Sequence, residues 1–198
     1  MDELTYQMPE ESAPGLLPAG RRVLVLGGSR SGKSRFAEEY FGADEQVTYV
    51  ATAPDYPGDA DWARRVREHR DRRPVTWSTV ETGDPARVLD RAFDGMPVLL
   101  DSVTTWLTRV MDECGCWDEV LSPESGERVA AALNAFEGAW ANTPALAVAV
   151  SDEVGSGIIP EHVALRRFRD ALGELNQRLA AQSDEVWLIT AGIPLRLR

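Results

Sequence analysis

Short apolar runs alternate along the chain with longer stretches in which apolar side chains recur every three or four positions. The clearest of these stretches covers 161–181 and predicts an amphipathic helix with a stripe formed by Leu165, Phe168, Leu172, Leu175 and Leu179. The alternation predicts an α/β fold in which helices cover both faces of a mostly parallel sheet. The expected strands are Arg22–Leu26, Val47–Ala51, Val75–Val80, Val98–Leu100, Ala145–Val150 and Val186–Thr190, and Leu195–Leu197 can add an antiparallel C-terminal edge strand. The expected helices are Ser34–Tyr40, Asp61–Asp71, Pro85–Phe93, Ser102–Asp112, Glu127–Ala141 and Glu161–Ala181.

The run between the first strand and the first helix is a complete phosphate-binding loop of the G-x-x-x-x-G-K-[ST] type. In the strand, loop, helix order, backbone N–H groups surround a phosphate, Lys33 reaches its oxygens, and the Ser34 hydroxyl can ligate Mg²⁺. Lys33 is the only lysine in the chain, which indicates a chemical requirement at this place. The sequence therefore predicts a P-loop NTPase-like three-layer sandwich whose nucleotide contacts include Gly27, Gly28, Ser29, Arg30, Ser31, Gly32, Lys33 and Ser34.

A carboxylate stands at the end of the apolar strand 98–100. In phosphate-loop proteins an acid at this point lies beside the loop and holds Mg²⁺ directly or through water, so Asp101 is the second candidate metal ligand. An acid at the end of a buried strand is costly unless a partner compensates its charge. The alternative is that Asp101 or Ser102 caps the helix that follows.

The segment 64–73 carries six arginines around one histidine, in a chain that is otherwise acidic and has only two histidines. If the segment is helical, Arg65 and His69 share a face with Arg72 or Arg73, and Trp62 and Val66 lie on the buried side. That face can bind a polyphosphate. Neighbouring guanidinium groups disfavour an added positive charge, so a neutral His69 could attack phosphorus and form a covalent intermediate. The alternative is a solvated arginine-rich face that happens to carry a histidine.

Composition limits the classes of function. The chain has 198 residues and a net charge of −11, and this charge argues against nucleic acid as a partner. No apolar run approaches the roughly 20 residues that span a bilayer. Residues 1–20 lack the basic start and apolar block of a signal peptide, so we expect a mobile tail followed by one domain over 21–198. Cys114 and Cys116 are too close for an unstrained disulfide and are expected to be free thiols in a cytoplasmic protein.

Several motifs in one order resemble a known family over residues 21–198. They are the phosphate loop, V-x-Y-[VI]-A-T at 47–52, R-x-x-x-H-R-x-x-R-P at 65–74, L-L-D-S-V-T-T-W at 99–106, E-V-G-S-G-I-I-P at 153–160 and a last stretch over 167–186. Together they are similar to the bifunctional adenosylcobinamide kinase/adenosylcobinamide-phosphate guanylyltransferase of cobalamin biosynthesis.

This resemblance implies two reactions and a set of site residues. A corrinoid, adenosylcobinamide, is phosphorylated by GTP or ATP, and GMP is then transferred from GTP to the product through a guanylyl-histidine, which here would be His69. The resemblance also implies Mg²⁺, a homotrimer, and a nucleotide site in which the loop and Asp101 are joined by Ala51, Thr52, Ala53, Arg70, Asp71, Arg72, Arg73 and Glu81.

Two positions depart from the family pattern, and two other functions remain open. Arg109 and Asp152 stand where the family pattern has asparagine, which affects the expected corrinoid contacts more than the nucleotide chemistry. His162 matches no catalytic motif and is expected to be solvated. The first alternative function is a phosphate-loop kinase of another small metabolite. The second is a nucleotide-dependent switch, but such switches read guanine with N-K-x-D, and Lys33 is the only lysine.

Overall fold

One seven-stranded sheet organises the computed structural model, which describes residues 20–42, 44–53, 58 and 60–198. The strand order is β3-β2-β4-β5-β1-β6-β7, and all neighbouring pairs are parallel except β6 and β7. The strands are β1 Arg22–Gly27, β2 Thr48–Ala51, β3 Ser78–Glu81, β4 Val98–Asp101, β5 Ala147–Asp152, β6 Glu185–Thr190 and β7 Ile193–Arg196. The helices are α1 Lys33–Glu39, α2 Ala60–Arg72, α3 Pro85–Arg91, α4 Val103–Glu113, α5 Pro123–Asn142 and α6 Val163–Gln182. The mostly parallel α/β fold with an antiparallel edge strand is therefore confirmed, whereas the expected N-terminal tail lies almost wholly outside the described residues.

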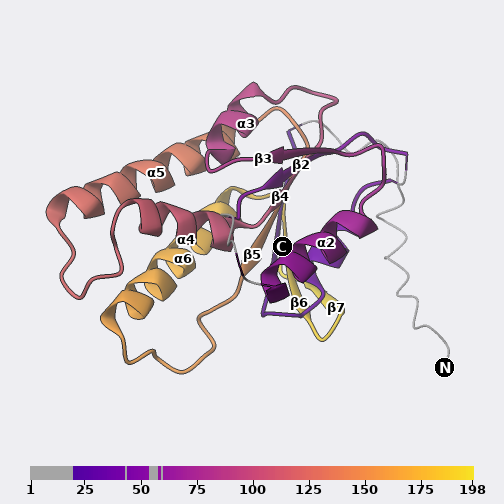
Figure 1. Cartoon of the computed structure of the whole chain (residues 1–198). Helices are drawn as coiled ribbons and strands as arrows, with labels where there is room; N and C mark the ends of the chain where they lie inside the picture. The colour runs from indigo at the N-terminus through magenta and orange to yellow at the C-terminus, as the bar shows by residue number, and fades with distance from the viewer. Residues whose placement is uncertain (1–19, 43, 54–57, 59) are drawn as a thin grey trace.

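Helices cover the two faces of the sheet unequally. Figure 1 shows α3, α4, α5 and α6 on one side of the sheet and α2 on the other. The larger core lies under the four helices and includes the fully buried Leu107, Phe136 and Leu172. The smaller core lies under α1, where the ring of Phe36 packs 5.2 Å from that of Trp187. Among the described residues, no helix is long and apolar enough to cross a membrane.

Three details differ from the sequence-based expectation. Strand β3 begins at Ser78 and not at Val75, because residues 74–77 form a turn closed by the Trp77 N–H on the Pro74 carbonyl, which leaves Val75 fully exposed. Helix α5 begins at Pro123 and not at Glu127, because Ser122 caps it. Val66 was expected on a buried side, but it is 38% exposed because α2 covers a cavity and not a packed core.

Candidate functional site

The phosphate loop follows β1 and turns directly into α1. Gly27 admits no side chain, since a Cβ would lie 2.4 Å from the Ser31 hydroxyl and 2.7 Å from the Ile189 carbonyl oxygen. Gly32 has a φ of 95°, a conformation that L residues rarely adopt. The loop is closed by the Ser31 N–H on the Gly28 carbonyl and is tied to the β6–β7 turn by the Gly192 N–H on the Ser31 carbonyl. The local backbone is therefore the one that the sequence motif requires.

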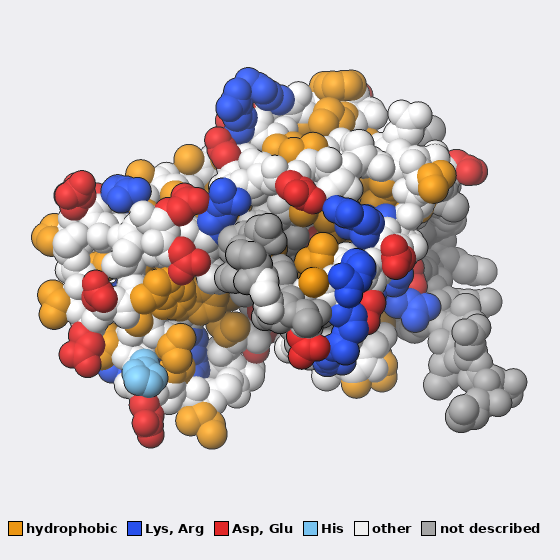
Figure 2. All heavy atoms as spheres, viewed as in Figure 1, with side chains coloured by type: hydrophobic (Ala, Val, Ile, Leu, Met, Phe, Trp, Pro, Cys, Tyr) orange, Lys and Arg blue, Asp and Glu red, His pale blue; other side chains and the backbone are white. Residues whose placement is uncertain are grey.

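A cavity of about 610 Å³ opens beside this loop, at the carboxyl ends of the parallel strands. Residues from the loop, from the ends of β2 and β4, and from α2 all line it. The cavity brings together most of the residues that the sequence analysis selected: Ser29, Arg30, Ser31, Gly32, Lys33, Ser34, Ala51, Ala53, His69, Arg72, Arg73 and Asp101. Figure 2 shows basic side chains gathered over α2, with acidic ones between them.

The Asp101 carboxylate has polar neighbours on both of its oxygens. One carboxylate oxygen accepts from the Ser34 hydroxyl at 3.5 Å, and the other accepts from the Tyr49 hydroxyl at 3.0 Å. Burial opposes ionisation of this acid, but hydrogen bonds from His69, Tyr49 and Ser34 favour the carboxylate, and the pKa of Asp101 is lowered. Burial and the nearby carboxylate in turn raise the pKa of Tyr49 well above its ordinary value. Asp101 is thus an ionised acceptor held in a defined orientation.

The oxygens of Ser34 and Asp101 form a donor pair suited to Mg²⁺. They lie 3.5 Å apart on one wall of the cavity, next to the phosphate loop. Magnesium commonly takes one or two protein oxygens together with phosphate oxygens and water. Within the described part of the chain, no group of three or more His, Cys, Asp or Glu side chains could hold a metal ion.

His69 faces the same carboxylate from α2. Its Nδ1 lies 3.4 Å from an oxygen of Asp101 and 3.9 Å from one of Glu38. Guanidinium groups were expected beside the imidazole, whereas the structure puts carboxylates beside Nδ1. The arginines that follow pair with the surroundings of the imidazole: Arg72 donates two hydrogen bonds to Glu38, whose Oε1 is also the atom 3.9 Å from His69 Nδ1, and Arg73 stacks 3.9 Å from the centre of the Tyr49 ring. Nδ1 is therefore the ring nitrogen turned toward Asp101, and Nε2 lies on the other side of the ring.

Some of the predicted residues lie outside the described lining of this cavity. Arg70 and Glu81 pair with each other at 3.4 Å and are 64% and 71% exposed. Thr52 is fully buried and donates to the Ser102 carbonyl at 2.7 Å, so it supports the strand ends. Asp71 is exposed on α2, and Gly27 and Gly28 form the base of the loop.

Glu38 and Tyr49 lie around the cavity without having been predicted from the sequence, and Asp152, expected to affect corrinoid contacts, instead faces the phosphate loop. Lys33 Nζ lies 2.7 Å from Asp152 Oδ1, at the end of β5. Two signals point to such residues: ligands bind at the carboxyl ends of parallel strands, and Glu38 stands one helical turn after Ser34.

The other residues considered in the sequence lie away from this cavity. Arg109 forms an ion pair with Glu113 at 2.9 Å on α4. Both cysteines are free and buried, as expected of unpaired thiols, and His162 is exposed.

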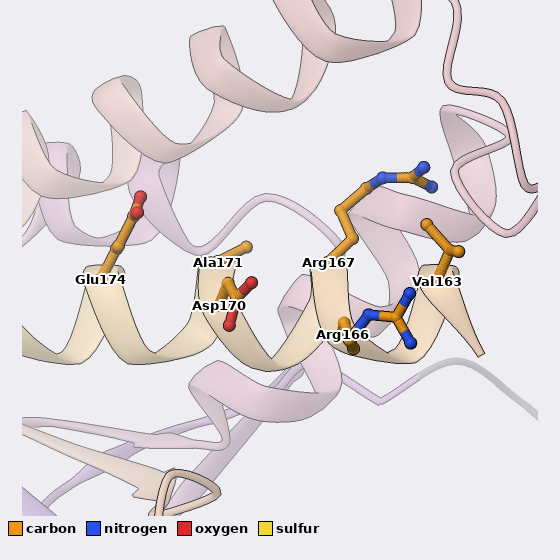
Figure 3. Close-up of a pocket in the computed structure, with 6 residues that line it drawn as sticks. All are labelled: Val163, Arg166, Arg167, Asp170, Ala171 and Glu174. Carbon is orange, nitrogen blue, oxygen red and sulfur yellow. The ribbon is translucent and has the colours of Figure 1, made fainter. Parts of the chain in front are cut away.

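A second hollow, of about 440 Å³, lies on the outer surface of α6 (Figure 3). Its guanidinium groups already bind backbone carbonyls: Arg166 donates to Pro160 and Glu161, and Arg167 donates to Cys116, Asp118 and Glu119. None of the residues selected from the sequence lines this hollow, so the cavity beside the phosphate loop is the candidate active site.

Comparisons with known proteins agree with one another. A family model described as cobinamide kinase/cobinamide phosphate guanyltransferase matches residues 23–197. The bifunctional adenosylcobalamin biosynthesis protein CobU of Salmonella typhimurium is 38% identical over 185 residues, which cover 89% of this chain and 99% of that protein. Escherichia coli CobU is 39% identical with the same coverage, and Pseudomonas aeruginosa CobP is 35% identical over 182 residues, covering 89% and 97%.

The solved structures show a likeness of fold alone. An ATPase from the type III secretion system of pathogenic bacteria superposes with a TM-score of 0.53 at 13% identity, covering 87% of this chain and 51% of that chain. The likeness supports the P-loop arrangement of strands and helices described above.

Proposed function

Because the chain belongs to the cobinamide kinase/cobinamide phosphate guanylyltransferase family, we propose that it phosphorylates adenosylcobinamide and then transfers GMP to the product. The donor of the first step is GTP or ATP, the donor of the second is GTP, and the final products are adenosylcobinamide-GDP and diphosphate. One observation carries the proposal: the phosphate loop, Asp101 and His69 line the same cavity. Kinase chemistry needs the first two, and guanylyl transfer through a covalent intermediate needs all three.

In the kinase step, the protein holds and orients the triphosphate. Lys33 and the loop N–H groups bind the β and γ phosphate oxygens. Ser34 and Asp101 would hold Mg²⁺, which neutralises phosphate charge when it is bound. The corrinoid hydroxyl oxygen then attacks the γ phosphorus, the bond between that phosphorus and the nucleoside diphosphate breaks, and the hydroxyl proton is released to water. No protein nucleophile is required.

In the guanylyl step, His69 supplies the nucleophile. Asp101 accepts a hydrogen bond from the Nδ1–H group of His69. The imidazole then carries its lone pair on Nε2, which points away from the carboxylate. Nε2 attacks the α phosphorus of GTP, a P–N bond forms, and the bond to diphosphate breaks. A phosphate oxygen of adenosylcobinamide phosphate then attacks the same phosphorus, and the P–N bond breaks.

The remaining parts of the proposal concern the other nucleotide contacts, the second substrate, the compartment and the assembly, and the homotrimer rests on the family resemblance alone. Ala51, Ala53, Arg72 and Arg73 bind nucleotide from the cavity wall, and Thr52 supports them. Arg70, Asp71 and Glu81 act from the exposed rim. The corrinoid is the second substrate, the protein works in the cytoplasm, and it assembles as a homotrimer.

The test separates the two activities at His69. We expect His69→Ala to keep substantial kinase activity, to lose the second reaction, and to form no GMP adduct when incubated with α-labelled GTP. The wild-type adduct should be acid-labile and base-stable, as a phosphoramidate is. The matched control is His162→Ala, since that histidine is exposed at the start of α6 and should leave both reactions intact.

Mass spectrometry of the protein treated with GTP gives the contrary outcomes. GMP found on another residue would remove His69 from the mechanism. No adduct under turnover conditions would leave a plain phosphate-loop kinase as the better account.

A further inference from the structure

The lysine of the phosphate loop already has a negatively charged partner. Lys33 Nζ lies 2.7 Å from Asp152 Oδ1 and also donates to the Gly28 carbonyl at 3.2 Å. The two side chains are only 13% and 27% exposed, so water and salt screen this pair less than they screen a surface pair. A phosphate that is to bind Lys33 must therefore compete with a carboxylate for the same ammonium group.

The backbone of Asp152 is fixed beside the loop. It ends β5 opposite Gly27 in the β1–β5 ladder, so it lies beside the first residue of the loop. Its backbone N–H donates to the Thr104 hydroxyl at 2.8 Å, and its carbonyl accepts from the Asn176 side chain at 3.0 Å. With the backbone held on both sides, only rotation of its own side chain can move the carboxylate.

Two other carboxylates of the cavity are committed to different partners. Asp101 accepts from Ser34 and Tyr49 and faces His69. Glu153 accepts from the backbone N–H groups of Gly155 and Ser156 and so shapes the turn after β5. Asp152 is instead paired with the lysine that the phosphates need.

We propose that Asp152 sets the affinity of the phosphate loop by competing with phosphate for Lys33. The pair holds the lysine in the empty site, weakens binding of the triphosphate, and forms again as a phosphate product leaves. This rests on the proposed function, in which the loop must release a nucleoside diphosphate after the first step and diphosphate after the second. A competing carboxylate favours release of both.

Equilibrium binding of GDP and of inorganic diphosphate, each with and without Mg²⁺, tests the proposal. Asp152→Asn keeps the shape of the side chain and removes its charge, so we expect GDP and diphosphate to bind about tenfold more tightly. The gain should be larger without Mg²⁺, because the metal shields phosphate charge. Damage to the fold would weaken binding, so a gain in affinity cannot come from a merely structural role.

The matched control is Glu153→Gln, which removes the same charge from the same wall without touching the lysine. An equal gain in affinity in both variants would overturn the proposal, because the effect would then come from the overall negative charge of the cavity and not from competition for Lys33. An unchanged affinity in Asp152→Asn would also overturn it. Weaker binding of GDP with Mg²⁺ in that variant would overturn it as well and would assign the carboxylate to the metal.

These measurements need neither the corrinoid nor the histidine adduct. Tighter GDP binding in a protein that forms no GMP adduct supports the role of Asp152 and contradicts guanylyl transfer. Unchanged GDP binding in a protein with both activities does the reverse. Absence of GDP binding in both the wild type and Asp152→Asn overturns the two proposals together.

Discussion

At the scale of single residues, substitution of Asp101 is expected to lower the turnover of both proposed reactions, since its carboxylate serves both. It accepts from Ser34 on the metal side and faces His69 on the other. We expect Asp101→Asn to lower the turnover of both reactions by about a hundredfold, and to weaken nucleotide binding far less, because neutralising charge matters most as the transition state forms. Steady-state rates compared with nucleotide dissociation constants would check this. A change confined to corrinoid affinity would contradict the assignment to the metal.

Lys33 tests whether the two reactions share one triphosphate site. If they do, Lys33→Ala abolishes kinase activity and GTP-dependent labelling together, because one ammonium group holds the β and γ oxygens in both. Both activities would be assayed on one preparation whose circular dichroism matches the wild type. Near-normal labelling with lost kinase activity would mean that the sites are separate.

The sequence predicts which residues form the site better than it predicts their positions relative to one another. The loop and the acid at the end of β4 were expected to lie together because an acid at this point lies beside the loop in phosphate-loop proteins, and the structure places both in one cavity. The carboxylates around His69 could not be derived in this way. Glu38 comes from α1 and Asp101 from β4, so their meeting at one imidazole depends on how α2 lies over the sheet.

At the scale of elements, each expected helix and strand has a counterpart, and the differences lie at the ends. Apolar periodicity identifies the buried part of an element but not a polar first turn, so α5 was expected to start four residues late. β-Branched residues indicate a strand only where their side chains pack against neighbours in the fold. Val75 belongs to a turn because Pro74 and Trp77 close it.

The N-cap of α4 joins helix stability to the site. Ser102 and Thr105 form a reciprocal capping box, and Ser102 directly follows Asp101. Ser102→Ala should lower the free energy of unfolding by about 1 kcal/mol and also reduce kinase activity, because the cap holds the chain that carries the acid. Urea titrations and rate assays would measure the two effects.

The control for this prediction is Ser122→Ala, which removes a similar cap from α5. Ser122 accepts from the Ser125 N–H and does not line the cavity beside the loop. We expect a similar loss of stability with normal activity. Equal activity in the two variants would show that the α4 cap does not serve the site.

At the scale of the whole molecule, the homotrimer implied by the family resemblance stays a prediction, and the surface gives a physical reason to expect assembly. Ile158 and Ile159 are adjacent in the chain and are 95% and 68% exposed, and a contact between subunits would bury them. Light scattering on protein eluting from a size-exclusion column should therefore give a molar mass three times the 21.8 kDa of the chain. A charged residue in place of Ile158 offers a probe, since it lowers the mass only if that side chain lies between subunits. A mass of one chain for the wild type at micromolar concentration would rule the trimer out.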